Sequence, residues 1–382
     1  MVIFHSSIFY FDFKAFAVAN WQSLKRFKFS LFIASLISFI ILGLLNILIV
    51  IFRLLDEVFY FGYRKTKIEK PVFIISNPRS GTTYLHRLMT LDQERYAFFL
   101  TYNTIGNSIL FNKLVTFFGK IDRRIGRPFR KFFDRTEKVF FSGWENIHPV
   151  SWNGSEEDEA PFVFSFTSPA VGIIYPFMKT YDWINFPDDY PPAKSKKLKN
   201  FYKNSLQRFM YSEGKGKTLL IKNVFSTGRV KLILECFPDA RVIYPVRHPY
   251  ETVPSLISMF AKPWKSIYKF IPEDSEEYRQ WGWLAIEYYK YFYRVSEVFP
   301  ASQFYTLKYD ELISEPEEVI NKIYHHFDLE KSNEFVKLLK EKTEYSKKYK
   351  SKHTYSLELY GLSRQLVYDE LKQIFEKYNF KQ

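Results

Sequence analysis

The chain has 382 residues, and its 25% charged and 47% hydrophobic residues exclude a mainly disordered protein. The net charge of +14 suits binding to a nucleic acid, an anionic membrane or a polyanionic ligand. Because no helix-turn-helix pattern, zinc spacing or aromatic RNA motif is visible, we expect no nucleic-acid partner. The single cysteine, Cys236, excludes an intrachain disulfide and a cysteine metal cluster.

The N-terminal part of the chain has the pattern of a membrane anchor. Residues 1–28 are aromatic and basic, and residues 29–52 then run for 24 positions without a charge. A spanning helix needs about 20 apolar residues, so this stretch predicts a transmembrane or monotopic helix, followed by a juxtamembrane linker over 53–67. Basic residues flank both ends, so the side of the membrane that faces the remaining chain stays open.

A strand, a tight turn and a helix follow the linker and predict an anion site. Residues 72–76 are apolar or small and indicate a buried parallel strand, and a helical pattern begins at Thr82. Backbone N–H groups and the positive end of a helix meet at such a turn. The GxxxxGK[ST] pattern of NTPases would need glycine at Ser76 and lysine at Thr82, so this is not an NTPase loop. The polar side chains that we expect at the anion are those of Arg79, Ser80, Thr82 and Thr83.

A long insertion, about 92–192, interrupts the α/β pattern. Residues 113–138 are strongly basic, which fits an amphipathic helix on a lipid surface as well as a solvated helix face. Further on, residues 156–159 form the acidic run Glu-Glu-Asp-Glu. Such a run is most often a solvated turn or helix start.

The second half of the chain predicts further strand and helix units. Lysine-rich residues 194–203 are interpreted as a polar boundary. Apolar strands are predicted over 217–223, 242–246 and 304–307, with helices over 227–237 and 278–298. We therefore predict an α/β, P-loop-like three-layer fold with a central, mostly parallel sheet flanked by helices, plus the N-terminal membrane helix.

A second candidate site lies after the strand over 242–246. Arg247 stands at its carboxyl end, and Ser255 lies about two turns into the next helix. Ligands of open parallel sheets bind at the carboxyl ends of the strands. Arg247 is therefore expected beside the first loop and its anion.

Four motifs, in this order, resemble those of the sulfotransferase superfamily, whose members use 3′-phosphoadenylyl sulfate (PAPS). They are PRSGTT at 78–83 after a strand, Arg247 eight residues before Ser255, Tyr309-Asp310-Glu311-Leu312 followed by Glu315-Pro316, and His353-x-Tyr355-Ser356-Leu357 with Gly361-Leu362. The third is similar to the family's YEDL-x-x-x-P segment, and the fourth resembles the C-terminal segment of the bacterial-type branch. The cytosolic branch's RKG segment is missing, and Lys352 and His353 are weak candidates to replace it.

The resemblance implies roles for these residues. The first loop would hold the 5′-phosphosulfate of PAPS, and Arg247 with Ser255 would hold its 3′-phosphate. Arg79 stands where the cytosolic branch has a catalytic lysine, so it is assigned the charge of the leaving phosphate. The cofactor-binding residues implied are Arg79, Ser80, Gly81, Thr82, Thr83, Tyr84, Arg247 and Ser255, with no metal.

The general base is left open between three residues. Bacterial-type relatives have an EDE run near the acceptor, and relatives with a PRSGTT loop employ a glutamate as base. This implies Glu157 and Glu159 as candidates, and His148 is the rival because the cytosolic branch uses a histidine.

The sequence thus predicts a membrane-anchored sulfotransferase that moves a sulfuryl group from PAPS to a hydroxyl of an unidentified acceptor: a lipid-linked alcohol, a glycan or a small alcohol. The expected organisation is an N-terminal segment over 1–28, a membrane helix over 29–52, a linker over 53–67 and a catalytic domain over 68–382. The alternatives are a P-loop nucleotide kinase or hydrolase, and a non-catalytic membrane-anchored protein on a degenerate sulfotransferase fold.

Overall fold

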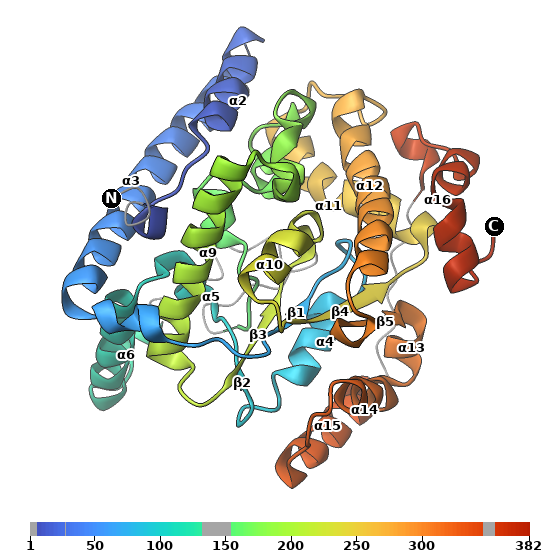
Figure 1. Cartoon of the computed structure of the whole chain (residues 1–382). Coiled ribbons are helices and arrows are strands. Elements are labelled where there is room, and N and C mark those ends of the chain that lie inside the picture. The colour runs from blue at the N-terminus through green and yellow to red at the C-terminus, as the bar shows by residue number, and fades with distance from the viewer. Residues whose placement is uncertain (1–5, 27, 132–153, 347–355) are drawn as a thin grey trace.

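A five-stranded parallel sheet forms the centre of the protein (Figure 1). The computed structural model describes residues 6–26, 28–131, 154–346 and 356–382. The strands lie in the order β2-β3-β1-β4-β5, and every pairing between neighbours is parallel. They are β1 (Val72–Ile74), β2 (Tyr96–Ala97), β3 (Thr218–Lys222), β4 (Arg241–Val246) and β5 (Phe304–Lys308). The predicted parallel sheet is confirmed; only the two-residue β2 had no counterpart among the predicted strands.

Helices cover both faces of the sheet and complete three layers. Side chains of a strand alternate between its faces, and in β1 Phe73 packs in one apolar core whereas Val72 and Ile74 pack in the other. One face is covered by α4 (Thr82–Met89), α14 (Pro316–His326) and α15 (Asn333–Ser346). The other is covered by α9 (Pro192–Glu213), α10 (Val230–Cys236), α11 (Pro249–Ile267), α12 (Glu276–Val298) and α16 (Arg364–Tyr378). The predicted three-layer α/β class is thus confirmed.

The interpretation of 194–203 as a polar boundary is wrong, because these residues lie inside α9. This helix buries Leu198, Phe201, Tyr202 and Leu206, which lie on one side of the helix, and its lysines lie mostly on the outer face. The helix predicted over 227–237 also differs, since residues 224–229 form the 3₁₀ turn η6 and α10 begins at Val230.

The insertion forms short helices and turns at the β2 edge of the sheet and over the second face. They are α5 (Thr101–Gly106), α6 (Ile109–Arg124), α8 (Ala160–Phe164) and the 3₁₀ turns η2 (Pro169–Ile173), η3 (Met178–Thr180), η4 (Asp182–Asn185) and η5 (Pro187–Asp189). The basic stretch predicted over 113–138 therefore starts in α6, and its part after residue 131 lies outside the described residues.

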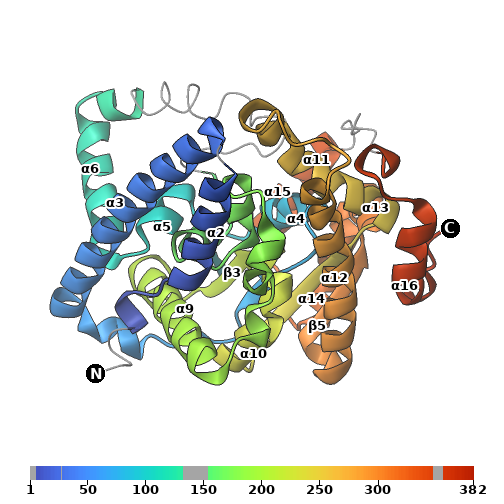
Figure 2. The same cartoon turned by 90° about the horizontal axis from the view of Figure 1, so that it is seen from above.

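The N-terminal segments form a helical pair along the outside of the domain (Figures 1 and 2). They are α2 (Phe13–Lys25) and α3 (Phe29–Phe59), and the turn η1 (Phe61–Lys65) leads from α3 towards β1. The 31-residue α3 is long and apolar enough to cross a membrane, although it continues past the predicted end at residue 52. Near the other end of the chain, η7 (Ala301–Gln303) precedes β5, α13 (Tyr309–Ser314) follows it, and η8 (Glu358–Tyr360) precedes α16.

Candidate active site

The loop between β1 and α4 has a backbone that only a few residues adopt easily. Arg79 and Gly81 have φ angles of 72° and 84°, in the left-handed region that disfavours side chains with a Cβ. A Cβ at position 81 would lie 2.8 Å from Cδ2 of Tyr309. Glycine is therefore required there, and the loop packs closely against the first residue of α13. Arg79 is held in this strained backbone conformation, and strain of this kind is common at functional sites. A fixed backbone suits an anion site, which needs donors in fixed positions.

Buried polar contacts hold the same loop on the carboxyl edge of the sheet. The Ser76 hydroxyl donates to the carbonyl oxygen of Pro245 in β4, and Asn77 Nδ2 donates to the carbonyl oxygen of Ala285 in α12 (3.1 Å). Ser80 Oγ is buried without a hydrogen-bond partner in the described part of the chain. An unpaired buried hydroxyl is costly unless a further group satisfies it. Together with the positive N-terminal end of α4, it suits a bound oxyanion.

Arg247 and Ser255 lie beside this loop because β4 is the neighbour of β1. Arg247 Nη1 donates to the carbonyl oxygen of Arg79 (2.9 Å), and Arg79 Nε donates to Ser255 Oγ (3.4 Å). The Arg247 guanidinium lies 4.5 Å from the ring centre of Tyr309, a cation–π contact, and pairs with Glu251 (2.7 Å). Two arginines and a serine from distant parts of the sequence thus form one cationic cluster.

Lys222 joins the loop to the acidic run, and sequence reasoning missed it. This lysine ends β3, the other neighbour of β1, and its side chain is fully buried. Its Nζ lies 3.2 Å from Thr83 Oγ1 and 3.0 Å from Glu157 Oε1. The signal in the sequence was a lysine as the last residue of an apolar parallel strand, a position that faces the ligand edge of the sheet.

The acidic run is built into the protein, so the common interpretation as a solvated turn does not hold for it. Asp158 accepts from Tyr202 Oη and from Asn223 Nδ2, both at 2.6 Å. Glu159 accepts from the same Asn223 amide and from Arg229 Nη2, again at 2.6 Å. Asp158 and Glu159 are therefore structural anchors, and they leave Glu157 as the carboxylate that points to Lys222 and the loop.

Burial sets the electrostatics of these two anchors. Desolvation raises the pKa of Asp158 and of Glu159, and the hydrogen bonds and the Arg229 charge described above oppose that rise. The Arg229 guanidinium also lies 3.6 Å from the ring centre of Phe162 in α8. The run is thus held rigidly, which fixes the backbone that carries Glu157.

The remaining predicted residues differ in how much the structure says of them. Thr82 begins α4, where it is buried, and Tyr84 lies in the first turn, packed on the apolar core of that face. His148, Lys352 and His353 lie outside the described residues. Within the described residues, no group of three His, Cys, Asp or Glu side chains is placed to hold a metal ion.

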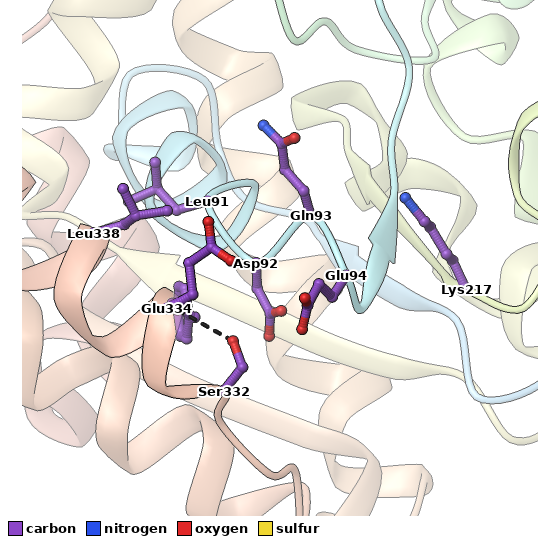
Figure 3. A pocket seen from close by; sticks show the side chains of 9 residues that line it. Leu91, Asp92, Gln93, Glu94, Lys217, Ser332, Glu334 and Leu338 are labelled. Carbon is purple, nitrogen blue, oxygen red and sulfur yellow. Dashed lines mark hydrogen bonds between the residues drawn. The ribbon is translucent and has the colours of Figure 1, made fainter.

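A cavity of about 700 Å³ lies elsewhere, at the amino edge of the sheet (Figure 3). Its lining includes Asp92, Glu94 and Glu334 against one cation, Lys217, just before β3. The Asp92 carboxylate is already bonded to Tyr324 Oη (2.9 Å) and Arg95 Nε (3.3 Å). An anionic nucleotide would be repelled there, so we assign the donor site to the carboxyl edge despite the size of this cavity.

The geometry defines a class: a P-loop-like α/β protein. Its loop lacks the lysine of the NTPase motif, and Arg79, Arg247 and Lys222 lie at the loop instead. Comparisons with known proteins then show which proteins the chain is similar to. The sulfotransferase family model matches residues 178–333. The omega-hydroxy-beta-dihydromenaquinone-9 sulfotransferase Stf3 of Mycobacterium bovis and of Mycobacterium tuberculosis is 24% identical over 324 residues, which cover 82% of this chain and 76% of that protein.

Solved structures agree in fold. The sulfotransferase STF9 of Mycobacterium avium superposes with a TM-score of 0.70 at 18% identity, over 85% of this chain and 81% of that one. The sulfotransferase STF1 of Mycobacterium tuberculosis superposes with a TM-score of 0.62 at 20% identity, over 87% and 84%. The family model, the curated relatives and these solved structures are all sulfotransferases, and together they support a transferase enzyme. This confirms the resemblance derived from the four motifs.

Proposed function

We propose that this sulfotransferase takes its sulfuryl group from PAPS, bound at the carboxyl edge of β1 and β4. The observation that carries the proposal is the cluster of Arg79, Ser255 and Arg247 beside the first turn of α4. The loop amides, Arg79 and the hydroxyls of Ser80, Thr82 and Thr83 suit the 5′-phosphosulfate. Arg247 and Ser255 suit a 3′-phosphate, which ordinary adenine nucleotides lack.

Glu157 is proposed as the general base that takes the proton of the acceptor hydroxyl. Its support is placement, since it contacts Lys222 and through it Thr83. Glu159, the other carboxylate predicted as base, is proposed to position the run through its ion pair with Arg229 (2.6 Å). Lys222 and Arg79 would meet the negative charge that develops on the leaving phosphate, with donor and acceptor in line.

For the acceptor we propose an amphipathic alcohol at a membrane. Two observations support this class: the apolar helix α3, and the relative whose name specifies a hydroxylated menaquinone derivative. The predicted division at residues 28, 52 and 67 stays a prediction, and contacts described below connect the N-terminal helices to the catalytic domain.

Transfer of radioactive sulfur from PAPS tests the reaction. We would supply the full chain in detergent with a long-chain prenyl alcohol or with a soluble sugar alcohol. We expect label on the prenyl alcohol, and Glu157→Gln should lower the rate about 10²–10⁴-fold, the usual contribution of a positioned base, while adenosine 3′,5′-bisphosphate still binds.

Two results would overturn parts of this proposal. Full activity of Glu157→Gln would remove Glu157 as base and return Glu159 and His148 as candidates. Donor binding without transfer to either alcohol would contradict the proposed acceptor class and favour the non-catalytic alternative. Magnesium-dependent preference for ATP would favour a nucleotide kinase.

A further inference from the structure

We propose that α3 lies in the plane of the membrane, in one leaflet, and does not cross it. The proposal starts from an apolar surface on α2, α3 and α6, here called the apolar platform. Only 17% of the most apolar 18-residue window of α3 is buried. The exposed side chains of the platform include Phe13 and Trp21 of α2, Phe29, Ile40, Leu44, Ile47 and Val58 of α3, and Phe117 and Phe118 of α6.

The opposite face of α3 is covered by protein along most of its length. In the N-terminal half, Leu31, Ser35, Ser38 and Leu42 are buried, spaced three or four residues apart on one side of the helix. The Phe16 ring of α2 stacks on Phe39 with 6.0 Å between ring centres. This half is therefore one side of a helical pair seated on the domain, as the two views show (Figures 1 and 2).

The pair is fastened to the domain by polar contacts. Asp12, which caps α2, accepts from Lys194 Nζ (2.5 Å) of α9 and from Trp183 Nε1 (3.2 Å). In the middle of α3, Asn46 Nδ2 donates to the carbonyl oxygen of Phe164 in α8 (2.9 Å). These contacts fix α2 at its start and α3 at its middle.

The C-terminal part of α3 is built into the core. Arg53 is fully buried and donates to Ser205 Oγ of α9 (2.7 Å) and to the carbonyl oxygens of Asn107 and Ile8 (both 3.2 Å). Asp56, also fully buried, accepts from the amides of Ile109 (3.0 Å) and Leu110 (2.9 Å) at the start of α6. Charged groups bonded in this way belong to the protein interior.

These contacts are incompatible with a separate membrane span. A spanning helix has to stand free of the globular domain over a hydrocarbon core of about 30 Å. Here the exposed apolar stripe runs beside a protein-covered stripe from Leu31 to Asp56. An in-plane helix has this two-sided character, with its apolar face buried about 5–10 Å into the leaflet.

Basic side chains around the apolar platform point to a lipid surface as its occupant. Exposed Lys25, Arg26 and Lys28 lie at the turn between α2 and α3, and exposed Lys113, Lys120, Arg123 and Arg124 lie on α6. A second copy of the chain would carry the same charges to the contact and repel them. Anionic headgroups attract them, so we commit to a leaflet that contains anionic lipid.

This placement deepens the proposed function, on which it rests for the reaction. The α8 helix that accepts the Asn46 bond begins directly after Glu159. α3 is thus bonded to a helix that follows Glu157 closely in the chain, so an alcohol with its chain in the leaflet would present its hydroxyl near the proposed base.

Depth measurements on the full chain test the proposal. Fluorescent labels would be placed on Phe29→Cys, Leu44→Cys and Val58→Cys, which replace side chains exposed by 80%, 64% and 68%. Cys236, which is buried, would be changed to Ser in all variants. Nitroxide lipids should quench all three labels at similar, shallow depths. A label at position 44 near the bilayer centre, with 29 and 58 at opposite surfaces, would overturn the proposal.

Flotation with vesicles gives a second, independent test. We expect Ile40→Glu/Ile47→Glu to lower binding to vesicles of phosphatidylcholine and phosphatidylglycerol about tenfold or more. The control Val298→Glu, at an even more exposed apolar side chain at the end of α12, should leave binding unaltered. Unchanged flotation of the double variant would contradict the proposal. A dimeric wild type that becomes monomeric in the double variant would also contradict the proposal, because the platform would then face a second copy of the chain.

Adenosine 3′,5′-bisphosphate binding separates this proposal from the proposed function. The double variant should bind this nucleotide with wild-type affinity, because its substitutions lie away from the donor site. Loss of membrane binding with intact nucleotide binding tests the platform alone.

Discussion

Lys222 connects the two halves of the proposed centre. Its buried ammonium lies between the hydroxyl of Thr83, in the anion loop, and the carboxylate of Glu157. A buried cation in contact with a carboxylate is held in place, so it needs little reorganisation when charge develops on a leaving group. The position of this one side chain makes the loop and the acidic run a single site.

Replacement of Lys222 by methionine should therefore reduce catalysis. We expect Lys222→Met to lower kcat about 10²–10³-fold, as for other preorganised donors, because the methionine keeps the length of the side chain but not the charge. Rates of sulfuryl transfer at saturating PAPS measure this. Lys217→Met, in an exposed position just before the same strand, is the control and should be normal; a wild-type kcat in Lys222→Met would contradict the role.

Asp188 gives a prediction for stability against pH. Burial raises the pKa of its carboxyl to about 6, although the amides of Lys231 and Leu232 and the Tyr291 hydroxyl donate to it. An acid whose pKa is raised in the folded state contributes its full stabilisation of the fold at pH values below its pKa in the unfolded chain, which is near 4. This contribution is lost as the pH rises through the folded-state pKa of about 6. Relative to Asp188→Asn, the wild type should lose about 2–3 kcal/mol of unfolding free energy between pH 4 and 7.

Urea unfolding of both proteins at pH 4, 5, 6 and 7 checks this difference. The two amides bond to different oxygens of Asp188, so the asparagine keeps an acceptor for one of them and has no proton to lose. Parallel pH profiles of the wild type and the variant would show that Asp188 does not carry the effect.

At the residue scale, local sequence signals located one half of the site and not the other. Arg79, Gly81 and Thr83 stand in a strand-turn-helix motif, and Arg247 follows a recognisable strand. Lys222 has no such motif, because its role depends on β3 being the neighbour of β1 and on Glu157 arriving from the insertion. Those are long-range contacts that spacing does not encode.

Among the elements, α3 differs most from the helix that composition alone suggests. Its apolar side chains fit a membrane, but Arg53 near its end is bonded on several sides by α9 and the segments around Ile8 and Asn107. The two properties occupy different faces and different turns of one helix. The element is thus a part of the domain core and, as proposed above, a membrane contact.

Arg53→Met should therefore destabilise the whole protein. Removal of one member of a buried, hydrogen-bonded charged network costs about 3–5 kcal/mol, because the groups left behind stay buried and unpaired. Urea unfolding in detergent micelles measures the change. The neighbouring Leu54 is 46% exposed, so Leu54→Ala should change stability by only about 0.5 kcal/mol. Equal stability of the two variants would contradict the interior role of Arg53.

Strands were easier to predict than helices in this chain. Buried parallel strands are short apolar runs, so β1, β3, β4 and β5 were located within one or two residues. Helix α9 was missed because lysines on its outer face dominate its first half. The end of α3 was missed because a change from apolar to charged composition does not interrupt a helix whose charges find partners in the protein.

For the whole molecule, the catalytic domain and the N-terminal helices behave as one packed unit. Arg208 of α9 contacts both Asp56 (3.3 Å) and Glu57 (2.6 Å) of α3, across the boundary that composition predicts at residue 67. Exposed basic side chains lie around the apolar platform, and Arg79 and Arg247 lie at the proposed donor site. These are the two places where we propose anionic partners, a lipid surface and a nucleotide.

The most direct test of the account is calorimetric titration of the full chain with adenosine 3′,5′-bisphosphate in the presence of EDTA. We predict micromolar binding that 5′-AMP and ATP do not reproduce, because they lack the 3′-phosphate. Arg247→Ala should weaken it by about 1–3 kcal/mol, the usual loss of a charge-assisted contact. No binding to a folded protein, or the same affinity in Arg247→Ala, would contradict the assignment of the donor site.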